Sequence, residues 1–375
     1  MIYLDCAATS LQKPREVIRS VERAMTAMTS PGRGGHKAAM AAAEAVFSCR
    51  EAAAELFHVP NPEQVVFTFN ATHGLNIAIY DLVASGDSVI VSGYEHNSVM
   101  RPLYHIGAKV HIVRSPLFDA EAMTEEFAKH LPKAKAAVCT AMSNVYGFRT
   151  PIKEISKLCK EYGVPLIIDA SQLAGAGKID FAALGAAYIA MPGHKGLLGP
   201  QGTGLLLCGN VPNPLIAGGT GTDSKSLGMP TVLPDVAEAG THNVHGIAGL
   251  EAGIRFVQRL GVPTIESRER RLLEGFQAYV SKIDGLETFF SPQPSLQGGV
   301  LSVRHKKIDC ELIAEALDRA GIAVRGGMHC APCAHKTGGT YESGTVRFSF
   351  SPFNTVKEVE YAARVLERCV NKEKT

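Results

Sequence analysis

Apolar and polar residues recur along the chain with two different periods. In "EVIRSVERAMTAM" (16–28) and "AMAAAEAVFSCREAAAELF" (39–57), apolar residues return at every third or fourth position, which predicts amphipathic helices. The same spacing predicts helices over residues 72–84 and 151–163. Short β-branched runs that end in turn residues have the pattern of buried strands, and they cover residues 64–69, 87–93, 109–115, 136–144 and 164–171.

The alternation of strands and helices predicts an α/β fold. Since parallel strands are joined by helical crossovers, we expect a large domain with a mostly parallel sheet covered by helices on both faces. The pattern changes after a long helical stretch at 246–261. Strands at 298–305 and 345–351 then mix with helices at 309–321 and 355–369, which predicts a smaller α+β domain.

Composition narrows the function. The chain has 375 residues, 46% of them hydrophobic, and a formal net charge of +2 without a basic block, so nucleic acid is not a favoured partner. No apolar run is long enough to span a membrane, and "MIYLDCAATS" does not resemble a secretory leader. The nine cysteines are irregularly spaced and odd in number, so we expect free thiols and a cytoplasmic location. The Gly-, Pro- and Thr-rich segment 218–243 is long for a connection and is a candidate functional loop.

A lysine and an aspartate are the first candidates for chemistry. Asp169 ends the strand in "PLIIDASQ", and Lys195 lies in "YIAMPGHKGLLGPQGTG". The lysine does not form a phosphate loop, which needs Gly before the Lys and Ser or Thr after it. Taken alone, Lys195 would be read as an ordinary loop lysine and Asp169 as an ordinary helix cap. A lysine and a carboxylate at successive strand ends are the pair that pyridoxal 5′-phosphate requires, one to bind the cofactor and one to hold its pyridine nitrogen protonated.

The motifs around these two residues resemble a known family. "DASQ" (169–172) and "GHKGLLGPQGTG" (193–204) resemble the class V aminotransferase-like enzymes, and within them the cysteine desulfurases and selenocysteine lyases. The likeness extends from "YLDCAATS" at residue 3 to "VRFSFSPFNT" at residue 346. It implies the fold type I of pyridoxal-phosphate-dependent transferases. We accordingly expect a large domain over 16–258 and a small domain made of 1–15 and 259–375.

The resemblance implies a set of cofactor contacts. The phosphate would be bound by Ala71, Thr72 and His73 at the start of a helix, by His194, and by Thr241 of the neighbouring subunit, which makes the protein a homodimer with shared active sites. Pro192 departs from the family, which usually has a phosphate-binding serine there.

The cofactor ring has its own implied contacts. His96 in "YEHNSV" would stack on the ring and relay protons, and Gln172 would bond the phenolic oxygen. Asn144 would lie near the ring hydroxyl and the substrate carboxylate, with Asp169 and Lys195 as above.

Two arginines are implied to bind substrate. Arg33 in "SPGRGGHK" would lie near the opening of the site on a mobile loop, and Arg347 would bind the α-carboxylate through both guanidinium nitrogens. The structural alternative for each is a surface ion pair.

The segment "VRGGMHCAPCAHKTGG" (324–339) allows three interpretations. Its C-x-x-C and two histidines are possible metal ligands. All of them lie within seven consecutive residues, however, and one short loop rarely completes a tetrahedral site. A redox disulfide between Cys330 and Cys333 lacks the surroundings of a thioredoxin-like motif. The family pattern instead makes Cys330 a nucleophile, with Arg325 and His329 as the nearby groups that would favour its thiolate. Met328 departs from the family's usual histidine, and Cys333 is unexplained.

These residues predict a cysteine desulfurase. L-cysteine would become L-alanine, with Lys195 as base and the sulfur captured by Cys330 as a persulfide for an acceptor protein. A selenocysteine lyase or another class V lyase or aminotransferase, with Cys330 incidental, remains an alternative. So does a protein that binds the cofactor and a partner without turnover. No metal is expected.

Overall fold

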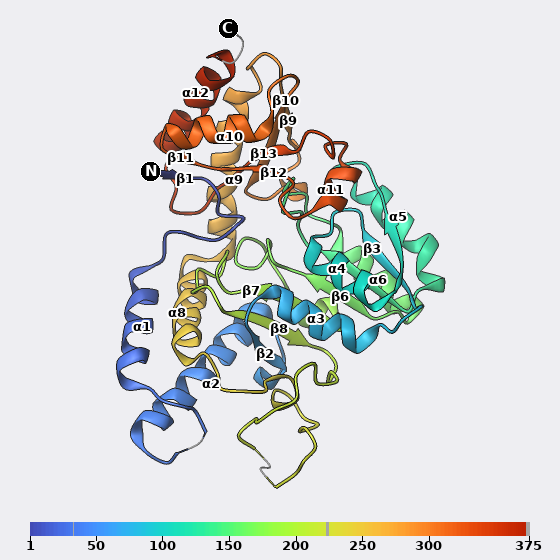
Figure 1. Cartoon of the computed structure of the whole chain (residues 1–375), viewed down its shortest axis with the longest axis vertical. Helices are drawn as coiled ribbons and strands as arrows, with labels where there is room; N and C mark the ends of the chain where they lie inside the picture. Colours follow the sequence, from blue (N-terminus) through green and yellow to red (C-terminus); the bar gives the residue numbers. More distant parts are fainter. Residues whose placement is uncertain (33, 223–224, 373–375) are drawn as a thin grey trace.

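A seven-stranded sheet forms the centre of the larger part of the molecule (Figure 1). The computed structural model describes residues 1–32, 34–222 and 225–372. The strands in spatial order are β2 (Val65–Thr68), β8 (Gly204–Cys208), β7 (Tyr188–Pro192), β6 (Leu166–Asp169), β5 (Ala136–Thr140), β3 (Ser88–Ser92) and β4 (Lys109–Val113). β7, β6, β5, β3 and β4 are mutually parallel, and β8 is antiparallel to both neighbours. The predicted mostly parallel sheet is confirmed.

Helices cover both faces of this sheet, as the strand pattern predicted. Successive residues of one strand enter different cores, because side chains alternate across a sheet: Ile168 packs in the core with α2, α5, α6 and α8, and Ile167 packs in the core with α3 and α4. The helices of this part are α1 (Arg15–Ala27), α2 (Lys37–Phe57), α3 (Ala71–Leu82), α4 (Asn97–Ile106), α5 (Ala120–His130), α6 (Ile152–Tyr162), α7 (Phe181–Leu184) and α8 (Val244–Leu260).

A second sheet organises the C-terminal part. Its strands are all antiparallel, in the order β12 (Arg325–Gly327), β13 (Thr345–Ser349), β10 (Val300–His305) and β9 (Leu286–Phe289). The helices here are α9 (Val262–Val280), α10 (Cys310–Arg319), α11 (Pro332–Thr337) and α12 (Val356–Lys372). Antiparallel strands with segregated helices form the expected α+β arrangement.

The N-terminus returns to this C-terminal part. β1 (Ile2–Tyr3) pairs in parallel with β11 (Ile322–Ala323), and Asp5 bridges Ser349. Leu4, just after β1, accordingly packs in one core with residues of α12 (Figure 1). The pairing supports grouping residues 1–15 with the C-terminal part, while the domain division itself stays a prediction.

The connections are otherwise short, with one exception. Single 3₁₀ turns span Pro62–Gln64, Leu131–Lys133, Asp235–Ala237 and Pro294–Leu296. Between β8 and α8, the described residues contain only one of these turns, at Asp235–Ala237, so the predicted long loop is present. Among the described residues, no helix combines the length and the apolar character needed to cross a bilayer.

Candidate active site

A cavity of about 490 Å³ lies at the carboxyl ends of β5, β6 and β7. This is the edge at which open α/β sheets bind ligands. Its lining includes eight of the residues selected from sequence, namely Ala71, Thr72, His96, Asn144, Asp169, Gln172, His194 and Lys195. The fold therefore brings together residues that lie up to 124 positions apart in the chain (71 to 195).

Asp169 and Lys195 reach the cavity from neighbouring strands. Asp169 is the last residue of β6 and is 3% exposed, and its Oδ1 accepts a hydrogen bond of 2.9 Å from Ser171 N. Lys195 follows β7, and burial lowers the pKa of its amine to about 8, although the charge of Asp169 acts in the opposite direction. The cavity thus holds an amine that is readily neutral beside a buried carboxylate.

Glycine permits the tight path of the chain after Lys195. A Cβ on Gly196 would lie 2.3 Å from Ala174 O, and one on Gly175 would lie 2.3 Å from Gly196 O. The loop that carries the lysine therefore packs backbone to backbone against the segment after Asp169, which fixes the two functional groups relative to each other.

His96 presents a defined tautomer. It caps α4, and its Nδ1 accepts a 3.0 Å hydrogen bond from Ser98 N. Nδ1 therefore carries no proton, and the neutral ring holds its proton on Nε2. Burial lowers the pKa of His96 to about 4, so the imidazole is neutral and offers one N–H donor.

The start of α3 lies at the cavity, and the predicted phosphate contacts of Ala71 and Thr72 stay predictions. Asn70 caps the helix by accepting a bond from His73 N, and the hydroxyls of Thr72 and Ser98 lie 2.7 Å apart. Ser98 and Ser171 both line the cavity. Pro192 also lines the cavity, so the hydroxyls of Ser98 and Ser171 lie in the same cavity as the residue that departs from the family pattern.

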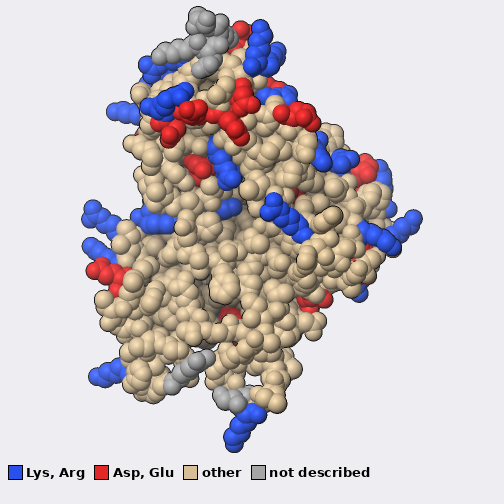
Figure 2. Space-filling model, in the orientation of Figure 1, with Lys and Arg blue, Asp and Glu red and all other residues tan. Residues whose placement is uncertain are grey.

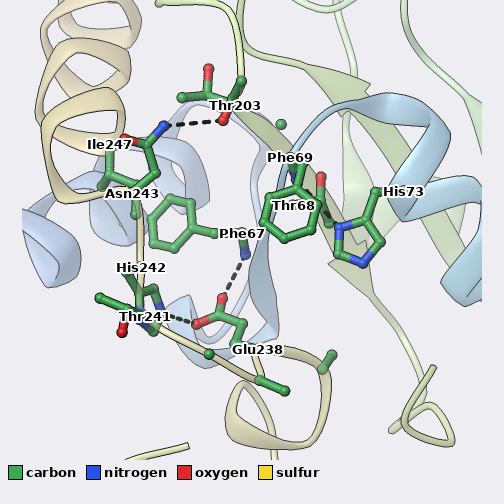
Figure 3. A pocket seen from close by; sticks show the side chains of 15 residues that line it. Phe67, Thr68, Phe69, His73, Thr203, Glu238, Thr241, His242, Asn243 and Ile247 are labelled. Carbon is green, nitrogen blue, oxygen red and sulfur yellow. Dashed lines mark hydrogen bonds and ion pairs between the residues drawn. The ribbon is translucent and has the colours of Figure 1, made fainter. Parts of the chain in front are cut away.

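His73 and Thr241 lie in a different pocket. That pocket, of about 500 Å³, is lined by Phe67, Phe69, His73, Thr241 and His242 among others (Figure 3). The His73 ring stacks on Phe69 with centroids 4.6 Å apart. The structure therefore does not bring these two side chains into the Lys195 cavity, and their predicted phosphate contacts stay predictions.

Two cavity residues are tied to the N-terminal segment. Gln172 Nε2 donates to Ala7 O over 2.9 Å, and the ring of His194 lies 2.9 Å from Thr9 Oγ1. Burial lowers the pKa of His194 to about 4, so it is a neutral group in this setting. The N-terminal segment is thereby attached to two residues that line the cavity.

Arg347 is already paired inside the protein. Its guanidinium is 1% exposed, lies 2.6 Å from the Asp5 carboxylate and donates to Asn144 O over 3.0 Å. A substrate carboxylate can bind Arg347 only in competition with Asp5, so its predicted role requires a rearrangement here. Arg33, the other predicted substrate residue, lies outside the described residues.

Cys330 is the exposed thiol of the site. Its Sγ lies 3.6 Å from Arg325 Nη2, and the adjoining His329 carbonyl accepts a 2.8 Å bond from Asn144 Nδ2 at the cavity. Arg325 is therefore the cation next to this thiol, and its predicted effect on the thiolate stays a prediction. The expectation that His329 also supplies positive charge is wrong, because burial holds its pKa well below the usual range and the ring is neutral.

Cys333 has a packing role in this structure. It is buried in α11 with its Sγ 4.0 Å from Ser92 O, and burial raises its pKa to about 11. Both Cys330 and Cys333 are free thiols. Within the described ranges, no group of three or more His, Cys, Asp or Glu side chains is arranged to hold a metal ion.

Sequence reasoning missed Glu95. Its carboxyl is fully buried, and Oε1 accepts bonds from Ser92 Oγ (2.5 Å) and Thr140 N (2.7 Å). Burial raises its pKa to about 8, with the nearby charge of Asp169 adding to the shift. The signal was a carboxylate directly before His96 in a segment that follows a buried strand.

Comparison with known proteins gives one consistent result. A sequence model described as Aminotransferase class-V matches residues 2–362. A "Probable cysteine desulfurase" of Methanothermobacter thermautotrophicus is 33% identical over 98% of this chain and 94% of its own length. One from Pyrococcus abyssi is 31% identical over 99% of this chain and 94% of its own.

Solved structures agree with these relatives. The apo cysteine desulfurase of Thermococcus onnurineus superposes with a TM-score of 0.92 at 29% identity, covering 99% of this chain and 95% of that one. The Escherichia coli cysteine desulfurase CsdA, in an S-sulfonic acid form, gives a TM-score of 0.85 at 26% identity, covering 99% and 94%.

Proposed function

The chain belongs to the class-V aminotransferase family, and from this premise we propose that it is a pyridoxal 5′-phosphate-dependent cysteine desulfurase. It converts L-cysteine to L-alanine and takes the sulfur onto Cys330 as a persulfide. The observation that carries the proposal is that Lys195 and Asp169 share one cavity, while Asn144 in the same cavity holds the loop of exposed Cys330. The relatives named as cysteine desulfurases support the same activity.

The donor groups of the cavity match the cofactor. Pyridoxal phosphate has a phosphate dianion, an aldehyde and a ring nitrogen, which require an anion site, an amine and a carboxylate. The first turn of α3 with Thr72 supplies N–H and hydroxyl donors, Lys195 the amine, and Asp169 the carboxylate. When bound, the cofactor supplies an electron sink for negative charge at the substrate Cα.

Lys195 and Asp169 divide the proton chemistry. With a pKa of about 8, Lys195 has a substantial neutral fraction near neutral pH, so it can bind the cofactor and accept the Cα proton. The Asp169 carboxylate would hold the pyridine nitrogen of the bound cofactor in its protonated form. His96 offers its Nε2–H to the bound group as a hydrogen-bond donor.

Cys330 performs the sulfur transfer. Its thiolate, next to Arg325, attacks the sulfur of L-cysteine, so that an S–S bond forms while the Cβ–S bond breaks. The electron pair of the broken bond stays on Cβ and takes up a proton. The removed Cα proton is replaced, so the products are alanine and the Cys330 persulfide.

We also propose that two copies form a dimer. On the face in Figure 2, charged residues gather over the C-terminal part, while the lower region is largely uncharged. The long connection before α8 carries exposed apolar side chains, including Ile216, Leu227 and Val232. A second copy that covers them would bring Thr241 near a neighbouring site. The free thiols are compatible with a reducing, cytoplasmic setting, and an acceptor protein would remove the persulfide sulfur.

Turnover assays test the proposed function. The protein loaded with pyridoxal phosphate should form alanine from L-cysteine, and Lys195→Ala should abolish this and should retain no cofactor after borohydride reduction. A panel of selenocysteine, cysteine sulfinate and transamination substrates separates the alternatives. Alanine and sulfide formation by Cys330→Ala at the wild-type rate would contradict the role of Cys330.

A further inference from the structure

The backbone at Cys330 has an uncommon conformation. His329 has φ of 49° and Cys330 has φ of 57°, and they are the one adjacent pair of non-glycine residues with positive φ in the part of the chain that the structure describes. Non-glycine residues rarely adopt a left-handed conformation, because it brings Cβ too close to the following carbonyl oxygen. A short loop keeps this conformation only if surrounding contacts impose it.

Several hydrogen bonds support it, and the turn itself is closed by a bond of 2.9 Å from Ala331 N to Met328 O. The ring of His329 bonds Thr345 of β13, with Nε2 2.9 Å from Oγ1 and 3.1 Å from the carbonyl oxygen. The His329 carbonyl accepts from Asn144 Nδ2, and the Cys330 carbonyl accepts from Asn97 N over 2.9 Å. Contacts with Thr345, Asn144 and Asn97 thus fix the two left-handed residues, while the Cys330 thiol itself is exposed.

The ring bond makes His329 a neutral donor. Since a carbonyl oxygen only accepts, the Nε2 that contacts Thr345 O carries the proton. Nδ1 is then a buried acceptor, and within the described residues it has no hydrogen-bond partner. An unpaired buried polar atom is unfavourable, because it has lost its hydrogen bonds to water without a replacement. His329, which directly precedes Cys330, therefore has both a left-handed backbone and a buried ring nitrogen for which the described residues supply no partner.

The contacts with Asn144 and Asn97 link this loop to the cavity. Asn144 lines the cavity that contains Lys195, and Asn97 is the first residue of α4, directly after His96. Both successive carbonyls are therefore bound by residues of the site in which the substrate would lie. This arrangement fixes where the Cys330 thiol stands relative to the cavity and keeps it near Arg325.

We propose that His329 is a positioning residue for sulfur transfer, whose ring bond to Thr345 holds Cys330 in the left-handed conformation that aims its thiol at the substrate. The inference rests on the proposed function for its substrate, but the positioning itself is a property of the chain without cofactor. It also gives a reason for histidine here, because the side chain must reach β13 from a strained backbone and donate an N–H there.

The test compares two substitutions at one position. His329→Leu removes the donor, and His329→Gln keeps an N–H group at a similar reach. His305→Leu is the matched control: His305 is buried at the end of β10, and its Nδ1 accepts hydrogen bonds from Lys307 N and Ile308 N in a turn that does not include the Cys330 loop. The first readout is the rate at which iodoacetamide alkylates Cys330 in the protein without cofactor.

We expect His329→Leu to slow this alkylation about fivefold, because the loop then no longer holds the thiol exposed beside Arg325. His329→Gln and His305→Leu should stay within about twofold of the wild type. In the loaded enzyme, His329→Leu should lower kcat for alanine formation about tenfold with little change in KM, and cofactor binding should be retained.

Two outcomes overturn the proposal. One is a folded His329→Leu protein whose alkylation rate and kcat are unchanged, and the other is an equal loss in all three variants, which would indicate general destabilisation. If the wild type forms no alanine from cysteine, the proposed function fails, whereas the alkylation rates still decide the positioning role.

Discussion

Lys195 shows how one side chain acquires its chemistry from its surroundings. Burial lowers the pKa of its amine from 10.5 to about 8, and Asp169 limits the decrease. The folded chain therefore binds fewer protons at Lys195 than the unfolded chain between these two values. Stability from this group rises as the pH increases from about 8 to 10.5.

This pKa leads to a prediction for cofactor capture. The rate at which Lys195 of the cofactor-free protein forms a borohydride-reducible bond with pyridoxal phosphate should rise with pH, with a midpoint near 8. Asp169→Asn should move the midpoint to lower pH, because the carboxylate that favours the ammonium form is gone. A midpoint near 10.5 in the wild type would contradict the buried setting of the amine.

Individual site residues were predictable to different degrees. Asp169 and Lys195 could be predicted from the sequence, because Asp169 ends one buried strand and Lys195 follows the next. The carboxyl ends of parallel strands meet at one edge of the sheet. The ion pair between Arg347 and Asp5 could not be predicted from the sequence, because it joins residues 342 positions apart in the chain. The neutral state of His329 was also hidden, because it depends on burial that only the packed loop creates.

Among the elements, α11 depends on close packing against the large sheet. A Cβ on Gly93 would lie 2.6 Å from Thr337 Oγ1 of α11 and 2.8 Å from Val113 O. The absent side chain at Gly93 therefore lets the helix that follows Cys330 approach the segment carrying His96.

Gly93→Ala should consequently destabilise the fold by about 1–3 kcal/mol through overpacking. Urea unfolding measures the change. Gly275→Ala is the control, because Gly275 lies within α9 with nothing within 4 Å of its Cβ position, and alanine there should stabilise by about 0.5–1 kcal/mol. Equal stability of Gly93→Ala and the wild type would mean that α11 is free to move away.

The elements themselves were largely visible in the sequence. The helices at Arg15–Ala27 and Lys37–Phe57 and the strands of the parallel sheet follow the apolar periods closely. Helices α4, α5 and α9 were not among the predicted segments; α4 contains Pro102, which weakens a helical pattern. The pairing of β1 with β11 joins two-residue strands from distant parts of the chain, and no periodicity reveals it.

At the scale of the whole molecule, the proposed dimer can be tested at its exposed apolar residues. Leu227 and Val232 are exposed on the long connection before α8. Replacing both with Asp should weaken a dimer at least tenfold by placing charge in an apolar contact, as measured by sedimentation equilibrium. Leu312→Asp, an exposed site on α10, should leave the dimer intact. A wild-type protein that sediments as a monomer throughout would contradict the dimer.

In the reaction that we propose, Lys195 takes a proton from cysteine and Cys330 accepts its sulfur. The most direct measurement is a single turnover. The enzyme with bound pyridoxal phosphate is mixed with an equimolar amount of L-cysteine in the absence of reductant. Alanine is then quantified, and the mass of the peptide that contains Cys330 is measured by mass spectrometry. We predict one alanine per active site and a mass increase of one sulfur atom on Cys330. Alanine formation with Cys330 unmodified, or no alanine at all, would contradict the proposed reaction.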